Sequence, residues 1–422
     1  MAVSATTVWR VRIGGNDVNA GCFDPMVVGA GVDYTEQDAA QLTLTDLASA
    51  GASITLSSAT GGFTAAMVGN GIRISGGTGF TAGLYIIAGF TSSNAVTLDR
   101  APSTGAATGA TGHIGGALGG VFGHNGAVPG NVVFIRGQGS NEPTDIDYTV
   151  ATPGFNTGYG LAYIGYNGRP KIGHNGKVWN FLNQYSLTLE NLYFVQTVAT
   201  STALGVYSSN QSNLALAYNC VFDQGGIDAT QATFLNIDRC SFINTGAQTA
   251  GARPIISVNT DLIRTSFIRN SLFKDLRSTA IYLNQGQCSV TGNVIMNCAG
   301  SGIVFRLTNY FSVPDVISGN TVFNCTGHGI EIQSTTTTRV YDNLVSGVTG
   351  ANYGLYVSDG IKLAVNLHSA SNMGRNNFHN CSNISNVTLP ASTLEVDPQF
   401  ISALNPTPTN TALRVLNGVG AL

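Results

Sequence analysis

A histidine and a glutamate stand three residues apart in the stretch NCTGHGIEI, residues 324–332. Histidine can act as a general acid or base near neutral pH, and hydrolysis of a glycosidic bond requires carboxyl groups. His328 and Glu331 are therefore catalytic candidates. The stretch NCAGSGIVF, residues 297–305, repeats the same frame with serine and valine at these two positions. The pair is thus either part of an active site or two substitutions in a repeated structural unit.

Glycoside hydrolysis needs a second carboxyl group about 5–9.5 Å from the first. Neighbouring strands lie about 4.8 Å apart, so an acid one or two repeats away could complete the pair. Asp359 follows the piece GLYV one repeat after Glu331, and Asp275 precedes the piece AIYL two repeats earlier. Both are further catalytic candidates, although neither occupies the position equivalent to Glu331.

The pieces AIYL, GIVF, GIEI and GLYV share a frame in which the third residue is Tyr282, Val304, Glu331 or Tyr356. Strand alternation directs this residue outward, because the isoleucines on either side of Glu331 suit a core. Aromatic faces suit sugar rings, so Tyr282, Glu331 and Tyr356 form a candidate ligand-binding stripe. The alternative is an ordinary outer face that carries one solvated glutamate.

The elements that must hold these residues follow from composition. Only 10% of the 422 residues are charged, against roughly 25% in an average protein, and 53 are glycine. This suits short strands and tight turns better than amphipathic helices. The net charge is −3 with no basic block, so we expect no nucleic-acid partner. No apolar run is long enough to predict membrane insertion, and no signal peptide is recognisable.

The acidic residues are sparse and separated, and the seven cysteines include no C-x-x-C pair. Calcium needs several clustered oxygen ligands, and zinc needs grouped cysteines or histidines. We therefore expect no metal and no other cofactor, and we interpret the cysteines as small buried apolar residues.

The second half of the chain repeats at intervals of 20–33 residues. The recurring pieces are NLYF at Asn191, NCVF at Asn219, RCSF at Arg239, NSLF at Asn270, NVIM at Asn293, NTVF at Asn320, NLVS at Asn343 and NNFH at Asn376. Units of this length with short β-type runs predict a solenoid in which asparagines and aromatic residues stack in columns. The expected core column is Phe194, Phe222, Phe242, Phe273, Met296 and Phe323. An antiparallel sandwich is the alternative, but it does not explain why asparagine and phenylalanine return in register.

The residue two positions after each asparagine is also mostly apolar, from Tyr193 in the first repeat to Phe378 in the last. Two adjacent residues of a regular strand cannot both face inward. Either the turn breaks the alternation, or one column forms an exposed apolar stripe. An exposed stripe would favour self-association, most simply as a homotrimer of parallel solenoids.

The Asn–Phe repeat resembles that of the right-handed parallel β-helix proteins, the pectate-lyase-like solenoids, over about residues 120–422. This resemblance implies an all-β protein: a right-handed parallel β-helix solenoid with a small N-terminal β module. The expected parts are an N-terminal strand leading into the β-helix (1–40), an inserted β module (41–118), the parallel β-helix (119–390) and a C-terminal capping segment (391–422). The stretch STGAATGATGHIGGALGG, residues 103–120, is low in complexity and predicts a hinge or an irregular loop.

The opening TVWRVRIGGNDVNAG, residues 7–21, and the following DYTEQDAAQLTLTDLA resemble predicted structural proteins of bacteriophages. Tailspikes, tail fibres and capsid decoration proteins of this kind combine an N-terminal attachment module with a trimeric β-helix. The resemblance implies a virion protein that is made in the host cytoplasm. It would contact other virion proteins through the module and, through the β-helix, a host-surface polysaccharide. The alternative is a polysaccharide lyase or glycoside hydrolase that depolymerises such a polysaccharide.

Overall fold

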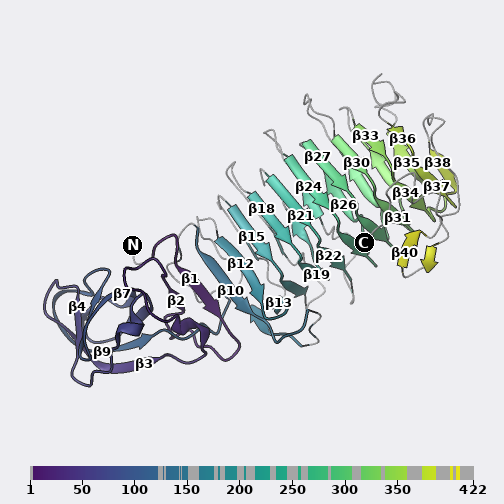
Figure 1. The fold of residues 1–422 in the computed structure, drawn as a ribbon. Helices are drawn as coiled ribbons and strands as arrows, with labels where there is room; N and C mark the ends of the chain where they lie inside the picture. Colours follow the sequence, from purple (N-terminus) through teal and green to yellow (C-terminus); the bar gives the residue numbers. More distant parts are fainter. Residues whose placement is uncertain are drawn as a thin grey trace. The chain divides into compact units, whose positions relative to one another are not determined.

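The described part of the protein is built almost entirely of β-strands (Figure 1). The computed structural model describes residues 3–121, 127, 130–141, 143, 145–150, 161–174, 179–180, 186–196, 204–205, 214–228, 234–244, 255–257, 265–283, 287–306, 315–333, 338–358, 373–385, 400–402 and 405–408. The only helices in these ranges are two short 3-10 helices, η1 (Tyr34–Glu36) and η2 (Ala65–Met67). Neither helix is long and apolar enough to cross a membrane. The chain divides into two compact units, residues 1–150 with 159–172, and residues 151–158 with 173–422.

The first unit begins with the strands of the first rungs. Strand β1 (Val8–Val11) pairs antiparallel with β2 (Cys22–Phe23) and parallel with β10 (Val132–Arg136), which in turn pairs parallel with β12 (Leu161–Tyr166). Strand β11 (Tyr148–Val150) lies beside β13 (Lys171–His174), whose first two residues belong to this unit. Trp9 of β1 is fully buried, and its indole N–H donates to the side-chain oxygen of Asn131 at 3.1 Å. The parallel stack therefore begins with β1, and its next strand, β10, follows in the sequence only after an inserted segment.

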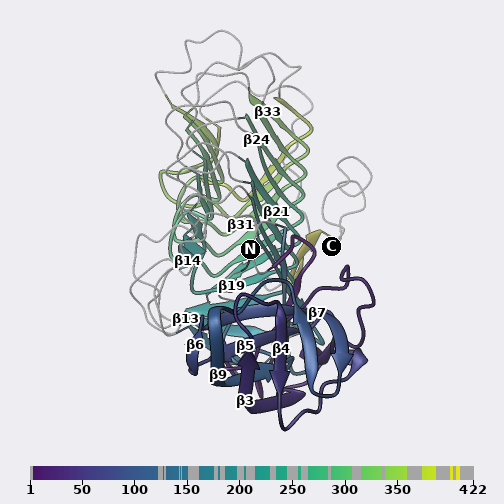
Figure 2. The same cartoon turned by 90° about the vertical axis from the view of Figure 1, so that its left-hand side faces the viewer.

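The inserted segment is a closed antiparallel barrel, seen from the front in Figure 2. Six of its strands follow the order β3-β4-β8-β7-β5-β9 and close through a β3–β9 pairing, and β6 pairs with the first part of β9, ahead of the residues that pair with β5. Closure removes exposed sheet edges, and the interior is filled by apolar side chains that include Leu47, Ile72 and Ile87. The strands are β3 (Leu42–Ser49), β4 (Thr55–Ser58), β5 (Gly71–Ser75), β6 (Thr78–Phe80), β7 (Gly83–Ser92), β8 (Ala95–Leu98) and β9 (Ser103–Ile114).

The low-complexity stretch that predicted an irregular loop is mostly a strand. Residues 103–114 form β9, twelve residues long, and β9 pairs with β3, β5 and β6. The prediction failed because glycine and alanine are poor strand formers by propensity. Here their small size instead admits neighbouring side chains: a Cβ on Gly112 would lie 2.5 Å from a methyl group of Leu47.

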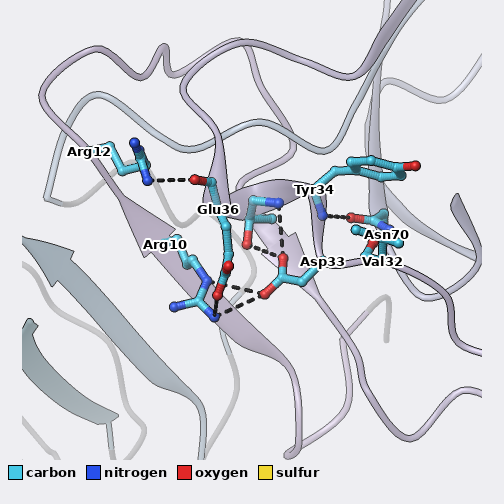
Figure 3. Close-up of polar contacts among 8 residues, drawn as sticks. Arg10, Arg12, Val32, Asp33, Tyr34, Glu36 and Asn70 are labelled. Atoms are coloured by element: carbon cyan, nitrogen blue, oxygen red, sulfur yellow. Dashed lines mark hydrogen bonds and ion pairs between the residues drawn. The ribbon is translucent and has the colours of Figure 1, made fainter. Parts of the chain in front are cut away.

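Arg10 lies on the outward face of β1 and anchors the loop that leads to the barrel (Figure 3). One terminal nitrogen of its guanidinium group lies 3.1 Å from a carboxylate oxygen of Asp33 and 2.8 Å from one of Glu36. The guanidinium carbon also lies 5.2 Å from the ring centroid of Phe134 and 5.8 Å from that of Tyr166. Arg10 thus joins two parallel rungs to the acidic loop through ion pairs and cation–π contacts.

The second unit is a parallel β-helix, in which each coil of the chain contributes one strand to each of three sheets (Figure 1). Sheet 1 contains β15 (Ser186–Glu190), β18 (Leu214–Tyr218), β21 (Phe234–Asp238), β24 (Thr265–Arg269), β27 (Gln287–Thr291), β30 (Asp315–Ser318), β33 (Thr338–Tyr341) and β36 (Met373–Gly374). Sheet 2 contains β16 (Tyr193–Gln196), β19 (Val221–Asp223), β22 (Ser241–Ile243), β25 (Leu272–Lys274), β28 (Val294–Met296), β31 (Thr321–Phe323), β34 (Leu344–Ser346) and β37 (Asn377–His379).

Sheet 3 contains β14 (Trp179–Asn180), β17 (Leu204–Gly205), β20 (Ile227–Asp228), β23 (Ile255–Ser257), β26 (Ile281–Leu283), β29 (Ile303–Phe305), β32 (Ile330–Ile332), β35 (Tyr353–Val357) and β38 (Asn383–Ser385). A separate antiparallel pair, β39 (Phe400–Ser402) and β40 (Asn405–Pro408), follows the coils. The predicted solenoid is confirmed, and the alternative of an antiparallel sandwich is wrong for this part of the chain.

The repeated asparagines occupy two adjacent columns, not one. Strand register aligns Leu272 with Val294, so Asn270, two residues before Leu272, is not equivalent to Asn293, one residue before Val294. The outer column turns the chain from sheet 1 to sheet 2 with positive φ and comprises Asn191, Asn219, Arg239, Asn270, Gly292, Gly319, Asp342 and Arg375. The inner, buried column comprises Leu192, Cys220, Cys240, Ser271, Asn293, Asn320, Asn343 and Asn376. Asparagine occurs in both columns. The repeated motif therefore begins with the outer residue up to Asn270 and with the inner residue, one position later, from Asn293 onward.

The inner asparagines form a continuous amide ladder. The side-chain Nδ2 groups of Asn293, Asn320 and Asn343 each donate to the Oδ1 atom of the next asparagine at 2.9–3.0 Å. Each of these Oδ1 acceptors also accepts the backbone N–H of the preceding asparagine. The fourth member is Asn376. Four fully buried amides are therefore satisfied without water, as burial of polar groups requires.

The aromatic column also differs from the predicted one in its second half. Phe194, Phe222, Phe242 and Phe273 stack at ring-centroid distances of 5.2, 4.8 and 4.8 Å, as expected. The register then continues the column with Ile295, Val322, Val345 and Phe378. Met296 and Phe323 belong to the neighbouring column, so their assignment to the core column was wrong. The cause is the same one-residue slip.

This correction removes the argument for an exposed apolar stripe. Strand register shows that the inward column takes the +3 residue of the motif in the first four repeats and the +2 residue in the last four. The outer Tyr193 and Val221 are nevertheless buried. Within the described residues, every strongly exposed large apolar side chain lies between Ile13 and Ile146, and none lies on the sheets of the second unit. The homotrimer therefore stays a prediction that rests on the resemblance alone.

Replacing Asn320 by alanine should destabilise the β-helix strongly. The change removes the side-chain amide of Asn320 and leaves the backbone N–H and one side-chain N–H of Asn293 without an acceptor. Each buried unsatisfied group costs about 1–3 kcal/mol, so we expect a loss of several kcal/mol, visible in the midpoint of denaturant unfolding. The control is Asn324→Gly, which removes an exposed amide at a positive-φ turn and should cost under about 1 kcal/mol. Equal losses in the two variants would show that the inner ladder is not a principal source of stability.

The seven cysteines are free thiols, as predicted: six are buried, and Cys381 is partly exposed. Burial raises the pKa of the Cys240 and Cys288 thiols and raises that of Cys381 to about 11. A thiol-specific disulfide reagent at pH 8 should therefore label at most Cys381 in the native protein, slowly, and all seven cysteines after unfolding. Labelling of a native Cys381→Ser variant would contradict this assignment.

Candidate functional site on sheet 3

Strand register confirms the frame shared by the two quoted stretches. Strand β29 pairs with β32 so that Val304 lies beside Glu331, and β32 pairs with β35 so that Glu331 lies beside Tyr356. Ile330 and Ile332 are fully buried, whereas Glu331 is half-buried on the outer face. The outward placement predicted for Glu331 and Tyr356 is therefore correct.

Glycine positions bring the sheets together at this point. A Cβ on Gly329 would lie 2.4 Å from a methyl carbon of Val345, and one on Gly354 would lie 2.6 Å from the ring of Phe378. The inward side chains of sheet 2 therefore require glycine in these coils. Each glycine is preceded by an aromatic residue, His328 or Tyr353, which is set at the corner where the chain enters sheet 3.

Three aromatic rings gather at this corner. The His328 ring stacks on the Tyr356 ring with a centroid distance of 4.3 Å and an interplanar angle of 5°. Tyr353 lies beside both, with its ring centroid 5.9 Å from that of His328 and 5.7 Å from that of Tyr356. We call His328, Glu331, Tyr353 and Tyr356 the sheet 3 cluster.

The carboxylate of Glu331 is held by two neutral donors. The Ser301 hydroxyl donates to Oε2 at 3.1 Å, and the Gln333 side-chain amide donates to Oε1. The same Ser301 oxygen accepts the backbone N–H of His328 at 3.1 Å. Ser301 is buried. It therefore links the loop that carries the histidine to the carboxylate, and the two candidate residues are positioned as one unit.

The hydrogen bond to the His328 ring fixes its tautomer. Nδ1 accepts the backbone N–H of Tyr353 at 3.0 Å, so the proton of the neutral imidazole resides on Nε2. Burial lowers the pKa of His328, and the nearby Glu331 carboxylate opposes that shift only in part. The ring is therefore neutral at pH 7 and offers its Nε2–H group as a hydrogen-bond donor.

The remaining candidates lie apart from the cluster. Asp275 occupies a positive-φ turn after β25, where its Oδ1 atom accepts the side-chain N–H of Asn297 at 2.7 Å. It stands two coils before Glu331, at the turn leading out of sheet 2, so the structure does not pair these two acids. Tyr282 shares the column of Glu331, but the buried Val304 separates them, and the Tyr282 hydroxyl accepts a long hydrogen bond of 3.4 Å from Arg306. Asp359 lies outside the described residues.

Three functional neighbours were missed by sequence reasoning: Ser301, Gln333 and Tyr353. Alignment of GHGIEI with NYGLYV would have found Tyr353, because it precedes the glycine as His328 does. Ser301 and Gln333 carry no such signal, because their role depends on side-chain contacts between coils. Among the described residues, no carboxylate hydrogen-bonds to Glu331, and no group of three histidines, cysteines or acids is arranged to hold a metal ion.

Comparison with known proteins agrees with the strand topology. Residues 178–345 match the family model of the right-handed beta helix region. The protein is thus an all-β protein with a right-handed parallel β-helix and a small antiparallel N-terminal module, as the sequence predicted.

Among solved structures, the chain is similar to tailspike protein 3 of bacteriophage CBA120. The two are 13% identical with a TM-score of 0.28, and the match covers 63% of this chain and 50% of the other. The chain therefore spans about half the length of that structure. No curated protein matches the sequence.

The lowered pKa of His328 predicts a pH-dependent stability. Because the folded pKa lies below the ordinary value of 6.5, the folded state favours the neutral ring. Its contribution is present above pH 6.5 and is lost as the pH falls through the folded pKa. His328→Phe keeps a stacking ring but cannot titrate, so its thermal midpoint should fall less between pH 7.5 and pH 5.5 than that of the wild type. An unchanged pH dependence would show that His328 is not held neutral by the fold.

Proposed function

We propose that this protein is a structural protein of a bacteriophage virion that attaches to a host-surface glycan through the sheet 3 cluster. The observation that carries the proposal is the outward group of three aromatic rings beside one carboxylate on an otherwise regular solenoid face. Its virion location and the contact of its N-terminal module with other virion proteins rest on the resemblance of its opening segment to phage structural proteins. So does assembly as a homotrimer.

The chemistry of the sheet 3 cluster suits a sugar. Carbohydrates combine apolar C–H faces with many hydroxyl groups, so their sites pair aromatic rings with fixed donors and acceptors. Here the rings come from His328, Tyr353 and Tyr356, the acceptor is the Glu331 carboxylate, and a donor is the Nε2–H group of neutral His328. Ser301 and Gln333 hold the carboxylate, so it needs little reorganisation on binding.

Binding fits this arrangement better than hydrolysis. Both carboxylate oxygens of Glu331 accept hydrogen bonds from neutral side chains, and the other acid candidate with a described position, Asp275, lies in a turn two coils away. Hydrolysis would need a second acid across the glycosidic bond. A depolymerase activity therefore remains the alternative outcome of the test below.

The N-terminal unit has a surface suited to attachment. Met26, Val28 and Val32 are 71%, 93% and 53% exposed within one loop before the barrel. Grouped exposed apolar side chains of this kind mark protein–protein contacts more often than they occur on isolated surfaces. This supports docking of the N-terminal unit to other virion proteins.

Loss of the Tyr356 ring should weaken glycan binding. Purified bacterial surface polysaccharides and their oligosaccharides would be titrated calorimetrically into the full-length protein. Aromatic contacts contribute about 0.5–1.5 kcal/mol beyond burial, so Tyr356→Ala should raise Kd by roughly tenfold. Tyr341→Ala, a half-buried tyrosine on sheet 1, is the matched control and should bind as the wild type does.

The same samples distinguish binding from cleavage. Size-exclusion chromatography should show no shortening of a bound polysaccharide. Shortening by the wild type that is lost in Glu331→Gln, with binding retained, would establish a depolymerase instead. Binding that is equal in the wild type and Tyr356→Ala, or absent across the panel, would overturn the proposed site.

A further inference from the structure

An exposed arginine on the outer face of sheet 3 has no acidic partner among the described residues. Arg306 directly follows β29, two residues after Val304, so strand alternation directs its side chain outward. Its guanidinium Nη1 donates to the Tyr282 hydroxyl at 3.4 Å, a long hydrogen bond that leaves the other donors accessible. By contrast, Arg269 and Arg375 form ion pairs with aspartates of the preceding coils. The charge of Arg306 is therefore accessible and is not compensated by a described acid.

The acid on this face of the β-helix is occupied elsewhere. Glu331 is the one acidic residue of the strands β26, β29, β32 and β35, and its carboxylate oxygens accept from Ser301 and Gln333. Gln333 also lies beside Arg306, because its backbone N–H donates to the Phe305 carbonyl at 2.6 Å. Its side-chain amide is turned toward Glu331, so the acid and the arginine present two separate charges on one face.

Strand register gives the separation between Arg306 and the rings of the sheet 3 cluster. Val304 lies beside Glu331, and Glu331 lies beside Tyr356. The coil of Arg306 therefore stands two strand spacings, about 10 Å, from the coil of Tyr356. A ligand that stacks on the Tyr356 ring and also reaches the guanidinium group must extend beyond one sugar ring. Such a ligand would run across the strands, along the axis of the β-helix.

We infer that the glycan bound on sheet 3 is an acidic polysaccharide, and that Arg306 binds its carboxylate or phosphate group. This inference rests on the proposed function, because it names the class of glycan that the sheet 3 cluster holds. A guanidinium group presents its N–H donors in a planar fork that matches either anionic group. Glu331 would repel an anion, so it faces sugar hydroxyl groups, and the anionic group lies on the Arg306 side of Gln333.

The test is calorimetric titration of the full-length protein with three groups of bacterial surface polysaccharides: neutral, uronic-acid-containing and phosphate-containing. Saturable binding is expected for acidic members only, and it should weaken at high sodium chloride concentration because salt screens exposed charges. Arg306→Gln should weaken this binding by roughly tenfold or more and remove most of its salt dependence. The matched control is Arg339→Gln, an exposed arginine of β33 on sheet 1, which should bind as the wild type does.

The same charge can be removed from the ligand. Chemical reduction of the uronic acids to neutral sugars should weaken binding by the wild type as much as Arg306→Gln does. The two changes together should weaken it no further than either change alone, because both remove the same ion pair. Binding confined to the phosphate-containing polysaccharides, and weakened by Arg306→Gln, would assign a phosphate group to this position instead of a carboxylate.

The outcomes separate this inference from the proposed function. Binding that Tyr356→Ala weakens but Arg306→Gln leaves unchanged would overturn the acidic ligand and retain sheet 3 as the glycan-binding face. Neutral polysaccharides that bind as tightly as the acidic ones would have the same meaning. Absence of binding by every polysaccharide of the three groups would overturn both.

Discussion

The second unit depends on one constraint: each coil pairs with the next in parallel register, about 4.8 Å away, so every side chain meets its own equivalents above and below. A buried column must therefore be compatible with itself. Phenylalanine satisfies this by ring stacking, and asparagine by donating one amide hydrogen to the next amide oxygen. A lone buried asparagine would be costly, whereas a run of four is satisfied throughout. The sheets, the turns and the outer face all take their positions from these columns.

The same constraint explains what the sequence could and could not reveal. Recurrence of Asn and Phe was enough to predict a parallel solenoid, because few other folds return residues in register. It could not separate Asn270, a positive-φ turn residue, from Asn293, a buried ladder residue. Both positions favour asparagine, and only the hydrogen-bond register shows which is which. The error carried Met296 and Phe323 into the wrong column.

Prediction of the candidate site had a similar limit. His328 and Glu331 were visible as departures from a template, and their outward placement followed from alternation. The contacts between coils were not visible: Ser301 joins His328 to Glu331 although it lies in the preceding coil. The barrel shows the opposite case. Its longest strand, β9, consists mostly of glycine, alanine and threonine. This segment is a strand because it packs closely against β3 and β5, and not because of the intrinsic propensity of its residues.

The asparagine ladder also gives the β-helix a chemical direction. In each amide–amide bond the N-terminal coil donates and the C-terminal coil accepts, while the same NH2 groups also donate to backbone oxygens of the preceding coil. A coil inside the ladder has the same groups on both sides, so it could be duplicated or removed and the ladder would close again. The coil of Ser271 differs, because its backbone N–H donates to the side-chain oxygen of Asn293 while its hydroxyl donates to the backbone oxygen of Arg269. The four asparagine coils are thus equivalent at this one position, whereas the coils before them place leucine, cysteine or serine there.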